Sequence, residues 1–485
     1  MAIIVPSYKE EIDILETTLR VLASHRHAKA CYDVFLAMEA RDPNGVAVAT
    51  SLIDLFKHKF RDLQFTLHPN GIEGEAPGKS SNVSWAAKAV EKKYVNQPDW
   101  TDVLITVMDS DTHLLSQYFE LIFQNHLRTR GEIGLSDVTF YMPPIVFDRN
   151  ASRVPRLVRM ADLMWCGAGL SCFNGRARRD AVAIPTAVYT ISLSLACLVG
   201  GWDTGSEAIG EDLHMLLKCY FATGGHLRTI SIPSPASQCN VSTGKSGIRG
   251  WAANHQARYS QGLRHMWGSL DTGFAVRQWF QLSQRRDSGS KSPFGRESSL
   301  PSHVLLRLKL GQHSVHQGEV KRYTWRNAVV FTRLFEAHFL PNHLFLVLLA
   351  SALYSSLIHP DNQWQILSYA LDMTSYMRAA GFALMTIYFV IFYEKYHQVC
   401  ISAREHEMRR AGLYEEMEDD FSHRKRWTLT AIVDYFIFPI SGTIFGSIPL
   451  FQAIVSHFWT EKLVYLVSAK PVKADKVREQ WKDGV

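Results

Sequence analysis

Three long apolar segments in the C-terminal third constrain the fold more than any other feature of the sequence. They cover residues 340–358, 379–393 and 429–458 and carry few charges. A helix needs ~20 apolar residues to cross a bilayer, and the second segment reaches this length only with its flanks, residues 376–396. Buried core helices are the alternative interpretation. We predict an integral membrane protein whose transmembrane region spans residues 336–467.

The basic residues predict which side of the membrane each part occupies. Residues 359–377 contain no Lys or Arg, whereas residues 395–426 contain seven. Because basic loops favour the cytosolic side, we expect the N-terminal domain and the 395–426 loop to face the cytosol. After three crossings the basic tail, residues 468–485, would lie on the wrong side. The prediction is therefore three or four segments, with a broken helix favoured by Pro439, Gly442, Gly446 and Pro449.

The first 130 residues alternate between short apolar runs and helical patterns. Strands are expected at 3–5, 34–38, 65–67 and 103–108, and helices near 11–24, 48–60, 80–94 and 115–128. Such alternation predicts an α/β fold with a mostly parallel sheet and right-handed crossovers. We expect one domain over residues 1–270. Interface helices and a Ser- and Gly-rich flexible loop at 287–299 are expected within residues 271–335.

Several functional classes are disfavoured. No G-x-G-x-x-G follows the first strand, and Gly78-Lys79-Ser80 and Gly244-Lys245-Ser246 lack the upstream glycine of a phosphate loop. A net charge of +6 is modest for 485 residues, so nothing suggests a nucleic-acid partner. Seven cysteines without a C-x-x-C pair predict neither a disulfide framework nor a zinc site, and they suit a reducing compartment.

Polar residues stand where the predicted strands end. The first strand leads into Pro6, Tyr8 and Glu10, the second ends at Glu39, and the fourth is followed by Asp109 and Asp111. Open α/β sheets bind ligands at this carboxyl edge, although a lone D-x-D can also be a helix cap or a solvated turn. Two further motifs follow downstream, the pair Glu211-Asp212 and the group Gln261, Arg264, His265 and Trp267.

In this order the motifs resemble those of the family 2 glycosyltransferases, particularly the membrane polysaccharide synthases of the cellulose, chitin and hyaluronan type. The resemblance covers residues 3 to about 270, and the trailing apolar segments agree with it in kind. It implies a Rossmann-like GT-A domain on the cytosolic face. Such a domain binds a nucleotide-sugar, here expected to be a UDP-sugar, together with Mg²⁺ or Mn²⁺. The expected acceptor is a glycan or a lipid-linked molecule, and membrane lipids are expected partners.

The resemblance also implies roles for individual residues. Asp109 and Asp111 match the D-x-D pair that holds the metal, and Glu211-Asp212 match the motif that contains the general base. Gln261, Arg264 and His265 match the Q-x-x-R-W signature, and Lys79 with Asn82 matches a G-K-x-x-N segment. The resemblance assigns nucleotide-sugar binding to Pro6, Tyr8, Glu10, Glu39, Lys79, Asp109, Gln261 and Arg264, and acceptor binding to His265 and Trp267.

The chemistry requires these residue types independently. A nucleoside diphosphate leaves only when its charge is neutralised, which a cation held by Asp111 and a bidentate Arg264 would do. The acceptor hydroxyl must lose a proton, so a carboxylate such as Asp212 is needed within reach. Direct displacement inverts the anomeric carbon. A helix N-terminal cap is the alternative for Glu211-Asp212.

One position departs from the pattern, because His265 stands where the family usually has Trp. An imidazole offers less stacking area than an indole, so acceptor binding is the part of the resemblance that this change affects. His265 is either a hydrogen-bonding substitute or a structural histidine. For His113 and His226 we expect structural roles.

Three functions follow from the sequence. The first is addition of sugars to a growing polysaccharide by a hexosyltransferase at a membrane. The second is a single transfer to a lipid acceptor. The third, a catalytically silent membrane scaffold, is disfavoured because Asp109, Asp111, Asp212 and Arg264 are all present.

Overall fold

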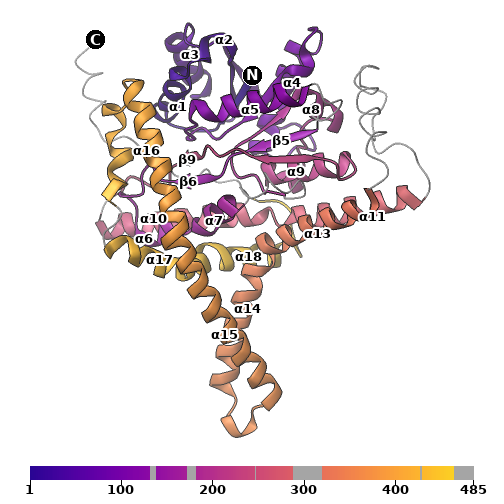
Figure 1. The fold of residues 1–485 in the computed structure, drawn as a ribbon, viewed down its shortest axis with the longest axis vertical. Coiled ribbons are helices and arrows are strands. Elements are labelled where there is room, and N and C mark those ends of the chain that lie inside the picture. Colours follow the sequence, from indigo (N-terminus) through magenta and orange to yellow (C-terminus); the bar gives the residue numbers. More distant parts are fainter. Residues whose placement is uncertain (131–137, 172–181, 246, 288–318, 426–428, 464–485) are drawn as a thin grey trace.

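A seven-stranded sheet forms the centre of the N-terminal domain in the computed structural model, which describes residues 1–130, 138–171, 182–245, 247–287, 319–425 and 429–463 (Figure 1). The strand order is β3-β2-β1-β4-β7-β5-β8. The strands are β1 (Ala2–Ser7), β2 (Asp33–Glu39), β3 (Asp62–His68), β4 (Leu104–Val107), β5 (Thr139–Met142), β7 (Tyr189–Ser192) and β8 (Arg228–Ser231). Only β7 runs antiparallel to its neighbours. The predicted mostly parallel sheet is confirmed.

Each face of the sheet has its own apolar core. Along β1 the side chains alternate: Ile3 and Val5 pack on one face, and Ala2 and Ile4 pack on the other. This period of two is what a strand buried on both faces requires. The first face is covered by α1 (Ile12–Ser24), α3 (Gly45–Phe56) and α5 (Ser116–Arg130), and the second by α4 (Lys79–Tyr94), α8 (Leu193–Val199) and α9 (Glu211–Ala222). The four predicted strands and four predicted helices are confirmed.

A layer of helices lies across one end of the sheet domain (Figure 1). It contains α6 (Arg156–Met160), α7 (Leu163–Ser171), α10 (Gly247–Trp267), α11 (Leu270–Asp287) and α13 (Glu319–His338). A short parallel pair, β6 (Ile145–Phe147) and β9 (Ala236–Gln238), lies between the main sheet and this layer. Of the loop predicted at 287–299, all but Asp287 falls outside the described residues, as does the basic tail 468–485.

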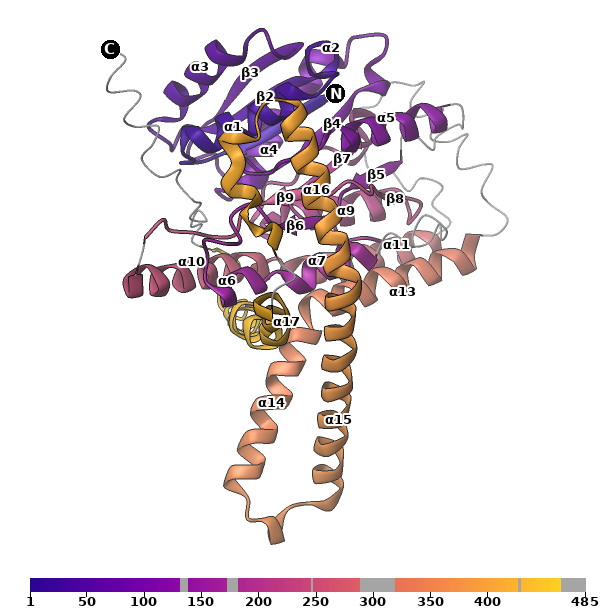
Figure 2. The ribbon, with the colours of Figure 1, turned by 60° about the vertical axis from the view of Figure 1, so that its left-hand side comes forward.

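Three helical stretches in the described part of the chain are long and apolar enough to cross a membrane. Two of them begin with α14 (Leu340–Leu357) and α15 (Gln365–Ile387), which form a hairpin projecting from the domain (Figures 1 and 2). No residue of α14 is buried, and Thr386 is the one buried residue of α15. Through a π-helical turn, α15 continues into α16 (Glu394–Arg410), which runs along the side of the domain.

The third stretch is placed differently. It consists of α17 (Leu429–Gly442), a π-helical turn and α18 (Ile448–Ser456), and it lies beneath the helical layer, across the direction of the hairpin (Figures 1 and 2). Within its apolar window 39% of the residues are buried, against 0% for α14 and 6% for the stretch that starts with α15. Its Asp434 pairs with Arg159 of α6 at 2.6 Å, so its polar side chains face the domain.

Candidate active site

A cavity of about 260 Å³ lies at the carboxyl edge of the sheet. It brings together residues that are far apart in the sequence, from Pro6 to His338. The predicted site residues that line it are Pro6, Tyr8, Glu10, Glu39, Lys79, Asp109, Asp111, Glu211, Asp212, Gln261, Arg264 and His265. Among the described residues, this cavity therefore gathers every predicted site residue except Trp267. His113 and His226 are not among its lining residues.

The sheet topology explains why the predicted site residues that follow strands lie close together. Strands β2, β1 and β4 are parallel neighbours, so their carboxyl ends meet at one edge. Glu39 ends β2, Tyr8 follows β1, and Asp109 and Asp111 follow β4. Of the other predicted site residues, Lys79 comes from the start of α4, Glu211 and Asp212 come from the start of α9, and Gln261, Arg264 and His265 come from α10.

One end of the cavity is formed by Glu39 and its neighbours. Glu39 is 2% exposed, and burial raises the pKa of its carboxyl although Arg41 partly offsets this effect. The Nε of Arg41 donates a hydrogen bond of 2.8 Å to Glu39, and its guanidinium carbon lies 4.5 Å from the centre of the Tyr8 ring. Asn82 donates to the carbonyl oxygen of Ala37 at 2.6 Å, which ties the start of α4 to β2. Arg41 therefore fixes an aromatic ring and a carboxylate together.

Lys79 joins two of the predicted motifs. Its ammonium lies 2.8 Å from Asp109 and 3.1 Å from Glu211. Burial alone would lower the pKa of Lys79, but the carboxylates of Asp109, Glu211 and Asp212 outweigh it and raise that pKa. Lys79 is the first residue of α4, so the helix start carries a permanent cation into the cavity.

Glu211 and Asp212 begin α9 but have different surroundings. Glu211 is 2% exposed and accepts hydrogen bonds from the hydroxyl of Tyr189 and, at 3.1 Å, from the indole nitrogen of Trp202. Burial raises the pKa of Glu211, with Lys79 opposing the shift. This carboxyl is therefore held on three sides.

The Asp212 carboxylate is oriented by the backbone. It accepts hydrogen bonds from the amides of Ala187 at 2.8 Å and of Leu213 at 2.9 Å. Ala187 has a φ of 64°, in the left-handed region that is uncommon for residues other than glycine. Such backbone conformations concentrate at functional sites. Asp212 lies in the first turn of α9, whose N-cap residue is Gly210, and its side chain lines the cavity.

The three motif residues Gln261, Arg264 and His265 are presented by α10. Arg258, one helical turn before Gln261, donates to the Gln261 side chain at 2.7 Å and to Asp162 at 2.6 Å. Arg258 and Asp162 are buried, so they fix this face of α10. The side chain of His265 is exposed to the cavity that it lines, and the surrounding protein together with the cations of Arg264 and Arg258 lowers its pKa.

The side chain of Trp267 does not line the cavity. Its ring is 4% exposed and packs with Leu450 and Ala453 of α18, and its indole nitrogen donates to the carbonyl oxygen of Glu461 at 3.0 Å. The contact with α18 is close because Gly262 faces the backbone of Phe445, where a Cβ atom would clash with the carbonyl oxygen. Trp267 and Gly262 thus join the cavity helix to the last apolar stretch.

Behind the pair Glu211-Asp212 lies a chain of charged groups that the sequence motifs did not reveal. His214 bonds to Asp271 at 2.6 Å and to Asp203 at 3.0 Å. Burial opposes protonation of His214, but the two carboxylates prevail and raise its pKa to about 9. Burial raises the pKa of Asp271 to about 6, although His214 partly opposes the shift. Asp271 lines the cavity, so this chain reaches it.

The donor set of the cavity fits a hard divalent cation. Among the described residues, no cluster of three or more His, Cys, Asp or Glu side chains could hold a metal alone. The carboxylates of Asp109 and Asp111 both line the cavity, and carboxylate oxygens are ligands that Mg²⁺ takes. Mg²⁺ is commonly held by one or two carboxylates, with substrate phosphates and water completing the shell. The residues therefore fit a cation that binds together with a diphosphate.

Sequence and fold comparisons place the chain among known proteins. The model of glycosyl transferase family group 2 matches residues 104–468. The mannosyltransferase PcManGT from Pyrobaculum calidifontis, solved with GDP-Man and Mn²⁺, has a TM-score of 0.34 at 14% identity, covering 78% of this chain and 85% of its own. TarS residues 1–349 from S. aureus, solved with UDP-GlcNAc, has a TM-score of 0.30 at 10% identity, covering 70% and 92%. No curated protein sequence matches the chain.

The family match contains most of the sequence. It begins at β4, the strand that leads into Asp109 and Asp111, and it extends past α18. Both the cavity helix α10 and the hairpin of α14 and α15 lie inside it. The chain is an enzyme that belongs to glycosyl transferase family group 2.

Proposed function

We propose that the chain transfers a sugar from a nucleotide-sugar, with a UDP-sugar as the expected donor, to an acceptor at the cytosolic face of a membrane. The transfer inverts the anomeric carbon and uses Mg²⁺ or Mn²⁺. The observation that carries this proposal is that Asp111, Asp212 and Arg264, which are far apart in the sequence, line one cavity.

The donor would lie along the sheet edge. Tyr8 and Glu39, held together by Arg41, suit a nucleoside at one end of the cavity. Asp111 would hold the cation, whose chemistry is to neutralise charge on the departing diphosphate. The guanidinium of Arg264 binds phosphate oxygens in a bidentate manner that Lys cannot reproduce. Asp111 with its cation and Arg264 would therefore act on the diphosphate leaving group and not on the acceptor.

The acceptor would be activated from the other side. Asp212, fixed by the amides of Ala187 and Leu213, is the proposed general base that removes the hydroxyl proton. Glu211 is held by Tyr189, Trp202 and Lys79, and we assign it the role of positioning Lys79. His265, which lines the cavity, is the proposed hydrogen-bonding contact to the acceptor.

The part of the cavity towards the membrane helices favours a second candidate, a single transfer to a lipid-linked acceptor. Apolar side chains of Phe147, Trp165 and Met266 line this part, together with Ala337 and His338 at the end of α13. The next helix, α14, is the first membrane candidate and has no buried residue. An apolar floor beside a lipid-facing helix suits the lipid part of an acceptor better than a free glycan.

For the membrane part we propose two crossings, made by α14 and α15. At about 1.5 Å per residue α14 is about 27 Å long, close to the thickness of the hydrocarbon core. The stretch α17–α18 would lie flat in the interface, with the exposed side chains of Ile432, Phe436 and Ile440 in lipid. The residues on both sides of the hairpin are then cytosolic, so the basic tail is on the expected side without a fourth crossing.

Cysteine labelling tests this topology. With native cysteines replaced by serine, Thr460→Cys and Asn362→Cys are labelled with an impermeant maleimide in sealed vesicles. We expect Thr460→Cys to react from the side of the N-terminal domain, and Asn362→Cys at the hairpin tip from the opposite side. Labelling of both from the same side would contradict two crossings.

Incubation of membranes that contain the chain with a panel of radiolabelled nucleotide-sugars tests the activity. We expect incorporation from one donor, loss in EDTA, and recovery with Mn²⁺ or Mg²⁺. Organic extraction followed by electrophoresis separates a lipid product from a polymer. Full activity in EDTA would exclude the metal role of Asp111, and no incorporation from any donor would contradict the proposed function.

A further inference from the structure

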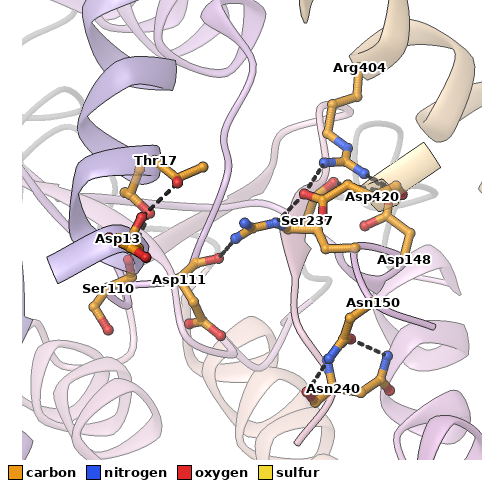
Figure 3. Close-up of polar contacts among 12 residues, drawn as sticks. Asp13, Thr17, Ser110, Asp111, Asp148, Asn150, Ser237, Asn240, Arg404 and Asp420 are labelled. Carbon is orange, nitrogen blue, oxygen red and sulfur yellow. Dashed lines mark hydrogen bonds and ion pairs between the residues drawn. The ribbon is translucent and has the colours of Figure 1, made fainter. Parts of the chain in front are cut away.

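The backbone of the loop Asp109–Asp111 and of the residues after it is held by three contacts, and Figure 3 shows the one at Asp111. Thr18 of α1 donates to the carbonyl oxygen of Ser110 at 2.7 Å. Two residues after Asp111, His113 exchanges backbone hydrogen bonds of 2.9 Å with Ser237 of β9. The guanidinium of Arg149, which follows β6, donates to the carbonyl oxygen of Asp111 itself. Arg149 thus contacts the residue that we assign to the metal.

Arg149 belongs to a group of four charges, which we call the charge cluster: the buried Asp148, Arg149 and Arg404, and the half-buried Asp420 (Figure 3). The Nε of Arg149 lies 3.0 Å from Asp420. Arg404 lies 3.5 Å from the same Asp420 oxygen and 3.3 Å from Asp148. The side chains of Arg404 and Asp148 are 2% and 0% exposed. Removing one member would leave an uncompensated charge among the other three, so the positions of the four side chains depend on one another.

The charge cluster connects the loop to the membrane hairpin. Arg404 is on α16, and α15 and α16 form one helical stretch of 46 residues from Gln365 to Arg410. Asp420 comes from the 3₁₀-helical segment Glu415–Lys425 after α16, where the ring of Phe421 packs 4.4 Å from the Arg404 guanidinium. The contact path from the hairpin to Asp111 therefore runs through Arg404, Asp420 and Arg149.

A second contact reaches the other end of the same loop. Glu407, one helical turn after Arg404, accepts hydrogen bonds from the backbone amide of Ser116 at 2.9 Å and from its hydroxyl at 3.2 Å. Ser116 is the first residue of α5. The segment from Asp111 to Ser116 is consequently held at both ends by groups on α16 or attached to it.

We propose that Arg149, Arg404 and Asp420 are positioning residues for Asp111, through which the helix that continues the membrane hairpin sets the place of the metal-binding loop. The inference rests on the proposed function, because it takes Asp111 as the metal ligand. Residues that orient a ligand commonly change metal affinity about 10–100-fold when they are replaced. A cluster that served only to stabilise the fold would leave metal affinity unchanged in the folded protein.

The test measures Mn²⁺ binding directly, with UDP as the probe that supplies the diphosphate. The full chain in detergent is titrated with Mn²⁺ in the presence of UDP, and free Mn²⁺ is followed by electron paramagnetic resonance. Asp420→Asn keeps the shape of the side chain and removes its charge. We expect the Kd for Mn²⁺ to rise about tenfold or more, and Asp420→Glu to restore part of the affinity.

The matched control is Glu394→Gln. Glu394 is a buried carboxylate on α16, ten residues before Arg404, and it accepts hydrogen bonds from Tyr435 of α17 and from Gln398. This variant should lose thermal stability and keep the wild-type Kd for Mn²⁺. If Asp420→Asn does not fold, Arg149→Lys replaces it, because a lysine cannot reach both Asp111 and Asp420 with a planar fork.

The outcomes separate the inference from the function on which it rests. Wild-type Mn²⁺ affinity in folded Asp420→Asn, or in Arg149→Lys, would overturn the inference and leave the proposed function intact. Absence of UDP-dependent Mn²⁺ binding by the wild-type chain would instead contradict the metal role of Asp111. An equal loss of Mn²⁺ affinity in Glu394→Gln would also overturn the inference, because any disturbance of α16 would then be enough to weaken Mn²⁺ binding.

Discussion

The ammonium of Lys79 lies 2.8 Å from the carboxylate of Asp109 and bridges it to Glu211, 3.1 Å away. One lysine thereby connects the loop after β4 with the start of α9. The three carboxylates Asp109, Glu211 and Asp212 would repel one another without it. Lys79 is therefore the residue that allows the two acidic motifs to face one cavity.

Replacement of Lys79 by Met should weaken donor binding. Loss of the cation leaves a partly buried cluster of negative charge that opposes a diphosphate, so we expect a higher Kd for UDP and about 3 kcal/mol less stability. Lys93→Met is the control, because Lys93 on the same helix also bridges two carboxylates, Asp33 and Asp62, away from the cavity. Isothermal titration with UDP and thermal melting separate the two effects. Equal UDP affinity in both variants would refute the assigned role.

Gly262→Ala should lower activity through helix packing. A Cβ atom at this position would meet the carbonyl oxygen of Phe445, which must move for the side chain to fit. Overpacking of this kind costs about 1–3 kcal/mol, and the shift displaces Gln261 and Arg264 on the same helix. Gly446→Ala is the matched control, because no atom lies within 4 Å of its added Cβ. A thermal melt and a transfer assay should find only Gly262→Ala impaired, and wild-type behaviour of that variant would contradict the close contact.

Stability should depend on pH through His214. Its pKa is about 9 in the folded chain against 6.5 as a model value, so the folded state holds the proton more tightly. This contribution is fully present below about pH 6.5 and is lost as pH rises through about 9. At about 1.4 kcal/mol per pH unit, the contribution is on the order of 3–4 kcal/mol. Melting of wild type and His214→Gln between pH 6 and 10 should show a stability difference that shrinks with pH, and a constant difference would contradict the prediction.

The sheet and one edge of the cavity could be predicted because their signals are local. A strand buried on both faces is a short apolar run, and its end is marked by the polar residues that follow, as at Glu39 and Asp109. Parallel neighbours then share an edge, which brings these residues together. This edge of the cavity could therefore be predicted without knowing which residues far apart in the sequence contact one another.

The charge cluster could not be predicted, because its members are related only by tertiary structure. Arg149 and Arg404 are 255 positions apart, as their numbers in the sequence show, and neither belongs to a short motif. Arg258 is an intermediate case. It precedes Gln261 by three residues, so helical spacing places both on one face and gives a usable signal.

Hydropathy alone also could not distinguish an apolar helix that projects from the domain from one that packs against it. The stretch α17–α18 meets the criteria of length and composition for a span, yet it packs against α6 and α10. The usable signals were Asp434 within the apolar run and the Pro and Gly residues that interrupt it. Trp267 illustrates the same limit, since its spacing from Arg264 did not reveal that it packs on α18.

The central claim is that Asp212 removes the acceptor proton in a cavity that binds the nucleotide-sugar with other groups. The most direct measurement compares Asp212→Asn with wild type in a transfer assay and in UDP titration. The substitution keeps the shape of the side chain and its place at the start of α9 but removes the base. The account predicts that transfer is abolished while the Kd for UDP is nearly unchanged; transfer at the wild-type rate by Asp212→Asn would contradict it.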